Sequence, residues 1–437
     1  MSTRNLTEAI LDGGIYSINF FNGRLLSGED LSQEQGANSE ARRRMGLAIG
    51  DGIAAGLEVS ESVDASKPDA PVVTVKAGLA VNRQGNTLEL AADTDVSLVM
   101  PGTSAGTSQG LFATCQPPGT YIAGAGVYLL TVAPATGTQG LASVSGLGNV
   151  AASCNVRYNI DGVQFRLIAV NLPVETVQDS TRLRNVLAHL CFGTSDFLVQ
   201  TFAFEPLSNA LQGGYGLLDT LRQSGGTQVG CLTDADVPLA MISWTLDNGI
   251  EFIDRWSVRR RITRPSPDTR WPLLIGDRRR SEAEAMFLQF EDQVRDISTN
   301  EVDNMRTMVA TQRFTTLPPF GFLPMVGGGS ITGFEFNTFF GTFSQRPLST
   351  DTIAMTNGNL LRPLLQEALY HDPISLIGPD TSSKFQLYSI WENVQAVQNG
   401  LTDQLTLVFA SSTLPYRGIA RFGYANLGLS HFPQTVR

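Results

Sequence analysis

The side chains that could do chemistry in this 437-residue chain are few and scattered. Two G-x-S-x-G strings, which share Gly106, place Ser104 and Ser108 where a nucleophilic serine would stand. Such a serine needs a strand leading into it and a helix leading out. Here the strings lie in residues 101–119, which are rich in Gly, Ser, Thr and Pro and predict a long surface loop. Because such strings arise by chance in a loop of this composition, the sequence does not support serine catalysis.

Acid–base and metal chemistry have equally little support. The chain has three histidines, His189, His371 and His431, and none belongs to the H-E-x-x-H pattern that binds zinc. His371 stands beside Asp372, which could hold it as a general base, but the polar end of a helix is the simpler interpretation. Scattered carboxylates could form a glycosidase pair only if the fold brought them together. We expect no catalytic or metal-binding residue.

Nucleotide cofactors are not expected either. No Gly-Lys dipeptide occurs, which excludes a phosphate-binding loop of the Walker type. The segment 124–126, Gly-Ala-Gly, lacks the third glycine of a dinucleotide motif and leads into a predicted strand. The three glycines at 327–329 also precede a predicted strand, so a turn is the better interpretation.

Thiol chemistry is not indicated. The four cysteines form no C-x-x-C pair, which favours free buried thiols and leaves a disulfide open. They are Cys115, Cys154, Cys191 and Cys231.

The charge of the chain favours protein partners. Charged residues make up 16% of it, against about 25% in ordinary soluble domains. Only three of its 31 basic residues are lysine, and arginine suits interfaces, although GC-rich codons would give the same excess. The net charge of −10 argues against a broad phosphate-binding face, so we expect sister subunits and no nucleic acid as partners.

The sequence predicts no transmembrane segment, because no stretch approaches the roughly 20 apolar residues that a spanning helix needs. A secretory signal needs a continuous apolar segment near the N-terminus. Here that region is interrupted by the charged residues Arg4, Glu8 and Asp12. We therefore expect synthesis in the cytoplasm.

Residues 1–52 are predicted to be an arm and a docking helix. An apolar stretch, 15–26, contains the turn signal Asn22-Gly23. Ser27 with Asp30 three residues later forms a capping box, so a helix is expected from there to about Ile49. Its C-terminal half carries Arg42, Arg43 and Arg44, where cations suit the helix dipole. This triplet is either a solvated face or a subunit contact.

Residues 53–262 predict antiparallel β structure, as a sandwich or two small barrels. Strands alternate with turns, and the Asp247-Asn248-Gly249 sequence is a strong hairpin signal. A short helix is expected at 179–189.

Residues 263–437 predict a helix followed by an α+β domain. After a proline-rich linker, residues 281–309 have helical spacing, but their apolar seam breaks after Ile297. We expect an amphipathic helix packed on a sheet, with a trimeric helical stalk as the alternative. Beyond it the chain predicts a strand-like piece at 331–343, a helix at 360–370 and strands at 385–391 and 405–410. The fold class is thus β-rich α+β, with an N-terminal helix, an antiparallel β middle and a C-terminal α+β domain.

Two further arginine clusters are local positive patches on an acidic chain. Neither has the interleaved aromatic residues of a nucleic-acid site, so we expect contacts with acidic patches of neighbouring subunits, or else solvated charge. The clusters are Arg259, Arg260, Arg261 and Arg278, Arg279, Arg280.

One stretch resembles the opening of a family encoded with phage-tail-like contractile injection systems. It consists of Phe20, Phe21, Asn22, Gly23, Arg24, Leu25 and Leu26, followed by Glu29, Asp30 and the arginines at 42–44. Three later motifs resemble the same family: Gly-Leu-Glu-Val at 56–59, Gly-Leu-Ala at 78–80 and Leu-Pro-Pro-Phe-Gly-Phe-Leu-Pro at 317–324. The resemblance is good over about residues 15–95 and patchy over 270–325. More distantly, it extends to the baseplate protein that links type VI secretion systems to their membrane complex.

This resemblance implies a structural component at the periphery of a baseplate, and it transfers no catalytic residue. The partners would be sister subunits in a trimer or ring and the baseplate, sheath or spike proteins, with any membrane association indirect. The particle would assemble in the cytoplasm and stay membrane-associated or be released. The seven residues at 20–26 and the arginines at 42–44 are the expected docking residues. The rival interpretations are a receptor-binding tail fibre or adhesin, and a carbohydrate hydrolase that uses the loop at 101–119.

Overall fold

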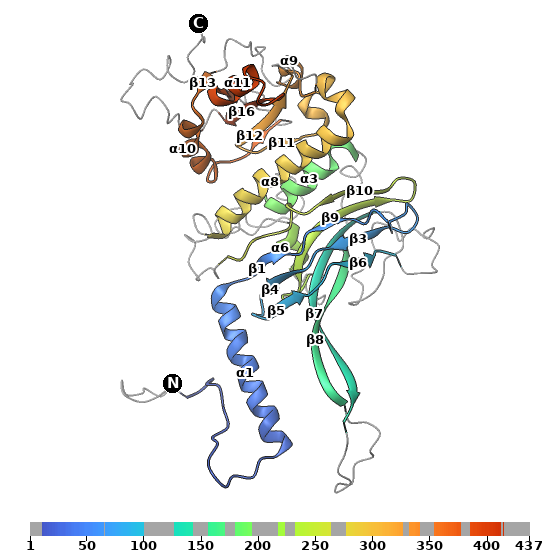
Figure 1. The fold of residues 1–437 in the computed structure, drawn as a ribbon, viewed down its shortest axis with the longest axis vertical. Coiled ribbons are helices and arrows are strands. Elements are labelled where there is room, and N and C mark those ends of the chain that lie inside the picture. Colours follow the sequence, from blue (N-terminus) through green and yellow to red (C-terminus); the bar gives the residue numbers. More distant parts are fainter. Residues whose placement is uncertain are drawn as a thin grey trace.

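The computed structural model describes residues 11–64, 66–99, 126–142, 156–170, 180–194, 217–222, 232–263, 277–326, 332–340, 354–376, 385–411 and 414. Several sheets, nearly all antiparallel, alternate with helices (Figure 1). The predicted β-rich α+β fold class is therefore confirmed.

The N-terminal helix α1 (Gly28–Ile49) extends away from the sheets (Figure 1). Its first turn forms the predicted capping box: the Ser27 hydroxyl accepts from the Asp30 backbone N–H at 3.1 Å, and the Asp30 carboxylate accepts from the Ser27 N–H at 3.0 Å. In the whole of α1, Gly46 alone is buried. The helix thus lacks the apolar face that would pack it onto its own chain.

The middle of the chain forms three antiparallel sheets. One contains β1 (Gly52–Gly56), β4 (Gly78–Val81) and β5 (Thr87–Leu90), and a second contains β2 (Val59–Glu61), β3 (Val72–Val75) and β6 (Thr94–Ser97). The third has the order β10-β9-β7-β8, built from β7 (Gly126–Leu141), β8 (Val156–Ala169), β9 (Val237–Thr245) and β10 (Gly249–Asp254). All three contribute to one apolar core that includes Val73, Leu88, Leu130 and Leu239.

The two faces of the four-stranded sheet are both covered. Successive strand residues point to opposite faces, so Leu130 joins the core of the three sheets while Leu129 faces the other way. There Leu129 packs on α3 (Ser180–Phe192) and α6 (Leu217–Arg222) through Leu187 and Leu217. The turn between β9 and β10 falls at the predicted hairpin, with Gly249 at a φ of 74°, a conformation that side chains disfavour.

The C-terminal part builds a second layered unit. Its sheet has the order β12-β16-β15-β13, from β12 (Phe320–Met325), β13 (Ala354–Thr356), β15 (Phe385–Ile390) and β16 (Leu405–Ser411). The helices are α8 (Asp277–Asn300), α9 (Phe336–Phe340), α10 (Gly358–Ala368) and α11 (Trp391–Gln398). The 3-10 turns η1 (Val302–Thr307) and η2 (Ala310–Gln312) and the strand pair β11 (Thr316–Leu317) and β14 (Ile374–Ser375) complete it.

The helix α8 packs on this sheet, as an amphipathic helix was predicted to do. Phe290 of α8 stacks edge-on against Phe409 of β16, with ring centroids 5.5 Å apart. Its ring also lies 5.3 Å from that of Phe314. Such aromatic pairs add to the burial of apolar surface in fixing the position of a helix.

Two predicted elements are wrong in type or length. The long helix ends at Asn300 rather than near residue 309, and η1 follows it. Buried Met305 and Met308 are three residues apart, the spacing that a 3-10 turn places on one side. The strand-like piece at 331–343 contains α9, because the Glu335 carboxylate accepts from the backbone N–H of Thr338 at 2.6 Å and begins a helix there.

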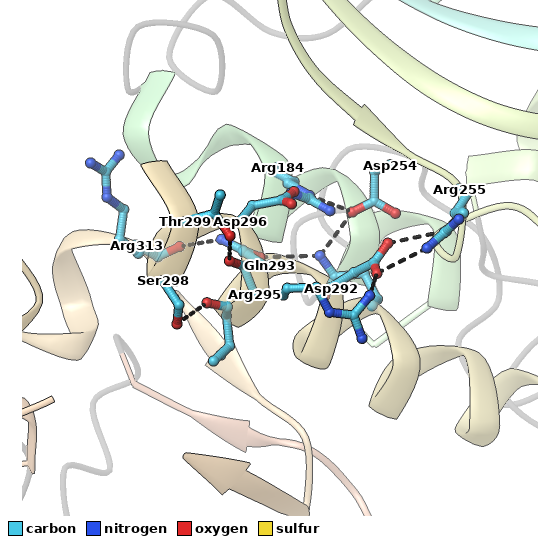
Figure 2. A network of polar contacts seen from close by, with 12 residues as sticks. Arg184, Asp254, Arg255, Asp292, Gln293, Arg295, Asp296, Ser298, Thr299 and Arg313 are labelled. Carbon is cyan, nitrogen blue, oxygen red and sulfur yellow. Dashed lines mark hydrogen bonds and ion pairs between the residues drawn. The ribbon is translucent and has the colours of Figure 1, made fainter. Parts of the chain in front are cut away.

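A polar network joins the middle and C-terminal parts at α3, β10 and α8 (Figure 2). The buried Asp254 carboxylate of β10 accepts from Arg184 of α3 at 3.0 Å and from Gln289 of α8 at 2.9 Å. Arg255 and Asp292 pair beside it at 3.1 Å. Elements far apart in the sequence are therefore held by side chains that satisfy one another away from water.

Candidate docking surface

The arm before α1 is bound along the helix by polar contacts. The Ile18 backbone N–H donates to the Glu34 carboxylate at 3.0 Å, and the Arg44 guanidinium donates to the Gly13 carbonyl at 2.8 Å. Arg24 pairs with Asp30 at 2.7 Å. These contacts hold the backbone of the arm and leave its apolar side chains in solvent.

The arm and helix expose an unusual number of large apolar side chains. We call the set the arm–helix surface: Leu11, Ile15, Tyr16, Phe20, Phe21, Leu25, Leu26, Leu31, Met45, Leu47 and Ile49. Four of them were predicted docking residues, and the exposed fractions are 52% for Phe20, 63% for Phe21, 93% for Leu25 and 53% for Leu26. Exposed apolar side chains that gather on one segment, as Phe20, Phe21, Leu25 and Leu26 do, often mark interaction sites.

Asn22 and Gly23 form the turn that the sequence predicted. The Arg24 backbone N–H donates to the Phe21 carbonyl at 3.2 Å across it. The two phenylalanines and the two leucines therefore lie on either side of one tight turn.

The arginines at 42–44 contact groups of their own chain, and Arg43 and Arg44 each also reach a segment outside α1. Arg43 and Arg44 both donate to the Glu40 carboxylate, which lowers the pKa of Glu40 to about 2. Arg43 also donates to the Gln84 carbonyl at 3.3 Å, between β4 and β5. Arg42 is exposed and donates to the carbonyl of Asn38 one turn earlier. The described contact of Arg42 thus lies within α1, whereas Arg43 and Arg44 also contact segments outside the helix.

The base of α1 rests on the body through two glycines. A Cβ atom on Gly46 would lie 2.1 Å from the carbonyl oxygen of Gly85, and one on Gly85 would lie 2.3 Å from the carbonyl oxygen of Arg43. Helix and turn therefore touch backbone to backbone, which fixes the direction in which α1 leaves the body.

Replacing Gly46 with alanine is expected to displace α1 from this turn while the sheets stay folded. Hydrogen exchange of the backbone amides at 43–50 and 82–86 should rise by more than tenfold, with the rest of the chain unchanged. The control is Gly36→Ala on the same helix, where a Cβ meets nothing within 4 Å and alanine stabilises the helix by about 0.5–1 kcal/mol. Equal exchange in the two variants would contradict the contact.

A second extension, the β7–β8 hairpin, lies at the same end of the molecule as α1 (Figure 1). The strand β9 pairs with β7 only from Gly126 to Val132, whereas the pairing of β7 with β8 continues to Leu141 and Val156. On the outer half of β8, Val156, Tyr158 and Ile160 are exposed at alternate positions and so share one face. A two-stranded ribbon is marginal in water by itself, which favours a partner here. These three residues were not among the predicted docking residues, although alternate apolar positions in a strand are a signal that the sequence contains.

The three arginines at 259–261 lie in different surroundings: Arg259 is buried, which argues against a subunit contact at that residue, Arg260 is half-buried and Arg261 is exposed. The interface role of Arg260 and Arg261 stays a prediction. Arg259 is only 8% exposed, and its guanidinium donates to the carbonyls of Gly56 and Leu57. Arg260 donates to the Trp256 carbonyl at 2.9 Å. Arg261 is exposed and pairs with Glu284 at 2.9 Å. The sequence shows three equal charges, but the fold places two of them where they bind backbone carbonyls of their own chain.

In the other cluster, the side chain of Arg280 is exposed. The side chains of Arg278 and Arg279 are not among those described. Their assignment to an interface stays a prediction.

The described histidine and cysteine side chains are His189, Cys191 and His371, and their contacts are those of residues that support the fold. His189 is buried with its Nδ1 2.8 Å from the Thr194 hydroxyl oxygen, and burial lowers the pKa of His189 to about 4. Burial raises the pKa of Cys191 to about 12, so its thiol is protonated at neutral pH. The His371 Nε2 lies 3.9 Å from a carboxylate oxygen of Glu367.

Several candidates of the sequence analysis lie outside the described residues. They are Ser104, Ser108, His431, Cys115, Cys154, Cys231, the loop 101–119 and the glycines at 124 and 327–329. Within the described ranges, no group of three or more His, Cys, Asp or Glu side chains could hold a metal ion. None of the helices described there has the length and apolar character needed to cross a bilayer.

No protein-family model matches this chain, and no curated protein is significantly similar to it in sequence. The arm–helix surface and the motifs at residues 20–44 are therefore the features from which a function can be inferred.

Proposed function

We propose that this protein is a structural assembly component of a contractile injection particle, at the periphery of the baseplate. The observation that carries the proposal is the arm–helix surface: a projecting arm and helix whose large apolar side chains find no cover within the described part of the chain. The resemblance of residues 20–44 to proteins of such particles supports the same assignment. The partners are sister subunits, in a trimer or ring, and neighbouring baseplate, sheath or spike proteins.

The mechanism is multivalent docking. Burying one large apolar side chain contributes roughly 1.5–3 kcal/mol, and association costs at least about 4 kcal/mol in lost freedom. A single arm therefore binds modestly. Copies arranged around a symmetric particle bind together, because each arm that docks raises the effective concentration of the next.

Particle binding should be lost when the aromatic anchors become polar. Phe20→Ser combined with Phe21→Ser removes the two exposed rings without touching a buried contact, so the chain is expected to fold normally. Its recovery with purified particles should fall at least tenfold, as measured by co-sedimentation and quantitative immunoblotting. Deleting residues 1–50 should leave a folded β-rich remainder that also fails to join the particle.

The matched control is Val63→Ser, because Val63 is 96% exposed and lies between β2 and β3, away from the arm. This variant should bind particles as the unaltered chain does. Undiminished particle binding by the Phe20/Phe21 double variant would overturn the docking role. A chain that never co-purifies with sheath, tube and spike proteins would overturn the proposed function itself.

A further inference from the structure

A pocket of about 370 Å³ lies between α8, α10 and β12. These three elements belong to the C-terminal unit, whereas α1 extends from the body in the other direction (Figure 1). The walls of the pocket are apolar side chains of these three elements and of the residue that follows α10: Phe287, Leu288, Phe320, Phe322, Leu365 and Leu369. Phe287, Phe322 and Leu365 are half-buried, since they pack on the core beneath and leave surface facing the pocket. At Gly321 the wall is bare backbone, because a Cβ there would meet the ring of Phe409 at 2.6 Å.

The charges around the pocket balance. Arg261 and Arg280 bring two positive groups, and Glu284 and Glu291 bring two carboxylates. Arg261 and Glu284 already pair with each other at 2.9 Å. A rim without net charge around an apolar centre resembles the anatomy of a protein–protein anchor site, where an apolar side chain enters and polar groups surround it.

The same chain presents an occupant of matching chemistry. In residues 15–26 the one charged residue is Arg24, and its charge is already paired with Asp30. Phe20 and Phe21 are adjacent, aromatic and more than half exposed. A volume of 370 Å³ is at the small end of the range for binding pockets, about 300–1,000 Å³, and suits a pair of aromatic side chains better than a long ligand.

Contacts of Ile18 with Glu34 and of Arg24 with Asp30 hold this part of the arm beside the first turns of α1, so most of the length of that helix lies between it and the body. The occupant therefore comes from another copy. We propose that the pocket between α8, α10 and β12 receives Phe20 and Phe21 of a second copy of this chain. This inference builds on the proposed function, since it names a sister subunit as the partner of the arm. Two different surfaces meet in such a contact, so copies join head to tail and form a ring where the rotation closes.

A peptide titration tests the pocket directly. A fluorescent peptide of residues 11–27 is added to the full chain carrying Phe20→Ser and Phe21→Ser, whose own arm leaves the pocket free. Fluorescence anisotropy should show saturable binding that falls at least tenfold when Leu365→Glu is introduced. Gln366→Trp should also weaken binding, because the indole ring would block the entrance of the pocket. Folding should be unaffected, since Gln366 is exposed and lines the pocket. Leu401→Glu is the control, since Leu401 is exposed outside the pocket and its substitution should leave binding unchanged.

Complementation of variants tests the head-to-tail geometry. The unaltered chain should form oligomers that grow with concentration in analytical ultracentrifugation. The Phe20/Phe21 double variant and the Leu365→Glu variant should each stay monomeric. An equimolar mixture of the two should stop at dimers, because it contains a single intact arm–pocket pair.

Peptide binding that Leu365→Glu and Gln366→Trp leave unchanged would overturn the proposal. So would a pocket that binds a small apolar dye, such as anilinonaphthalene sulfonate, but not the peptide. Self-association of either variant at the level of the unaltered chain would also overturn it. These results are distinct from failure of the proposed function, which is a loss of co-purification with the particle whatever the peptide does.

Discussion

Replacing Asp254 with alanine is expected to lower the free energy of unfolding by about 3–5 kcal/mol, because it breaks a buried ion pair from one side. The Asp254 carboxylate accepts from Arg184, from Gln289 and from the Ser257 backbone N–H. Alanine leaves these three donors facing a site closed to water. Among the described residues, buried Arg184 then keeps Asp296 as its counter-charge. The loss of stability therefore falls on the contact between the middle and C-terminal parts.

The measurement is urea unfolding followed by tryptophan fluorescence, with Glu284→Ala as control. Glu284 also pairs with an arginine, but that pair is half exposed, and exposed pairs contribute about 0–1 kcal/mol. The double variant Arg184→Met with Asp254→Leu should recover part of the stability, since it removes both charges rather than isolating one. Gln289 and the Ser257 backbone N–H still lose their acceptor, so recovery is incomplete. If Asp254→Ala were as mild as Glu284→Ala, the network could not be what joins the two parts.

Replacing Arg259 with methionine is expected to cost about 2–5 kcal/mol, since a buried acceptor left without a donor costs about 1–3 kcal/mol. The acceptors that lose a donor are the carbonyl of buried Leu57 and, in part, that of half-buried Gly56, which is also in the β1–β4 ladder. Leu57 also adopts a φ of 59°, which is rare for a residue with a side chain and persists only where the surroundings impose it. Arg259 is the group that holds this turn.

The variant Arg259→Lys keeps the positive charge but removes the planar guanidinium, so it shows which of the two stabilises the turn. A lysine ammonium lacks the planar fork that spans two carbonyls, so lysine should recover less than half of the lost stability. Thermal unfolding of the two variants and of Arg261→Met measures the difference. Arg261→Met should change the midpoint by less than 2 °C, because Arg261 is exposed. An equally small shift for Arg259→Met would show that the turn at Gly56 and Leu57 holds without its guanidinium.

The sequence predicted best where the deciding contacts are local. Ser27 and Asp30 are three residues apart and satisfy each other's backbone groups, so the start of α1 could be predicted. The Asn248-Gly249 turn has the same character. The sequence failed where the end of an element depends on distant packing. The long helix stops at Asn300 because Met305 and Met308 enter the core beside the C-terminal sheet.

The candidate site divides in the same way. The motif at 20–26 pointed to apolar side chains that the structure leaves exposed, and the turn between them depends on neighbouring residues alone. The arginines at 259–261 show the opposite case, because the sequence does not distinguish them. In the fold, Arg259 and Arg260 donate to backbone carbonyls of their own chain, whereas Arg261 is exposed and pairs with Glu284.

The sequence by itself determined the N-terminal cap of α1, the turns at Asn22-Gly23 and Asn248-Gly249 and the β-rich class, because each depends on groups a few positions apart. Only the tertiary structure decided which glycines let α1 rest on the body, which arginines were buried, and that α8, α10 and β12 enclose a pocket. The physical reason is that burial is a property of contacts between segments. Asp254 and Arg184 are 70 positions apart in the chain, so no local pattern of residue types predicts their contact.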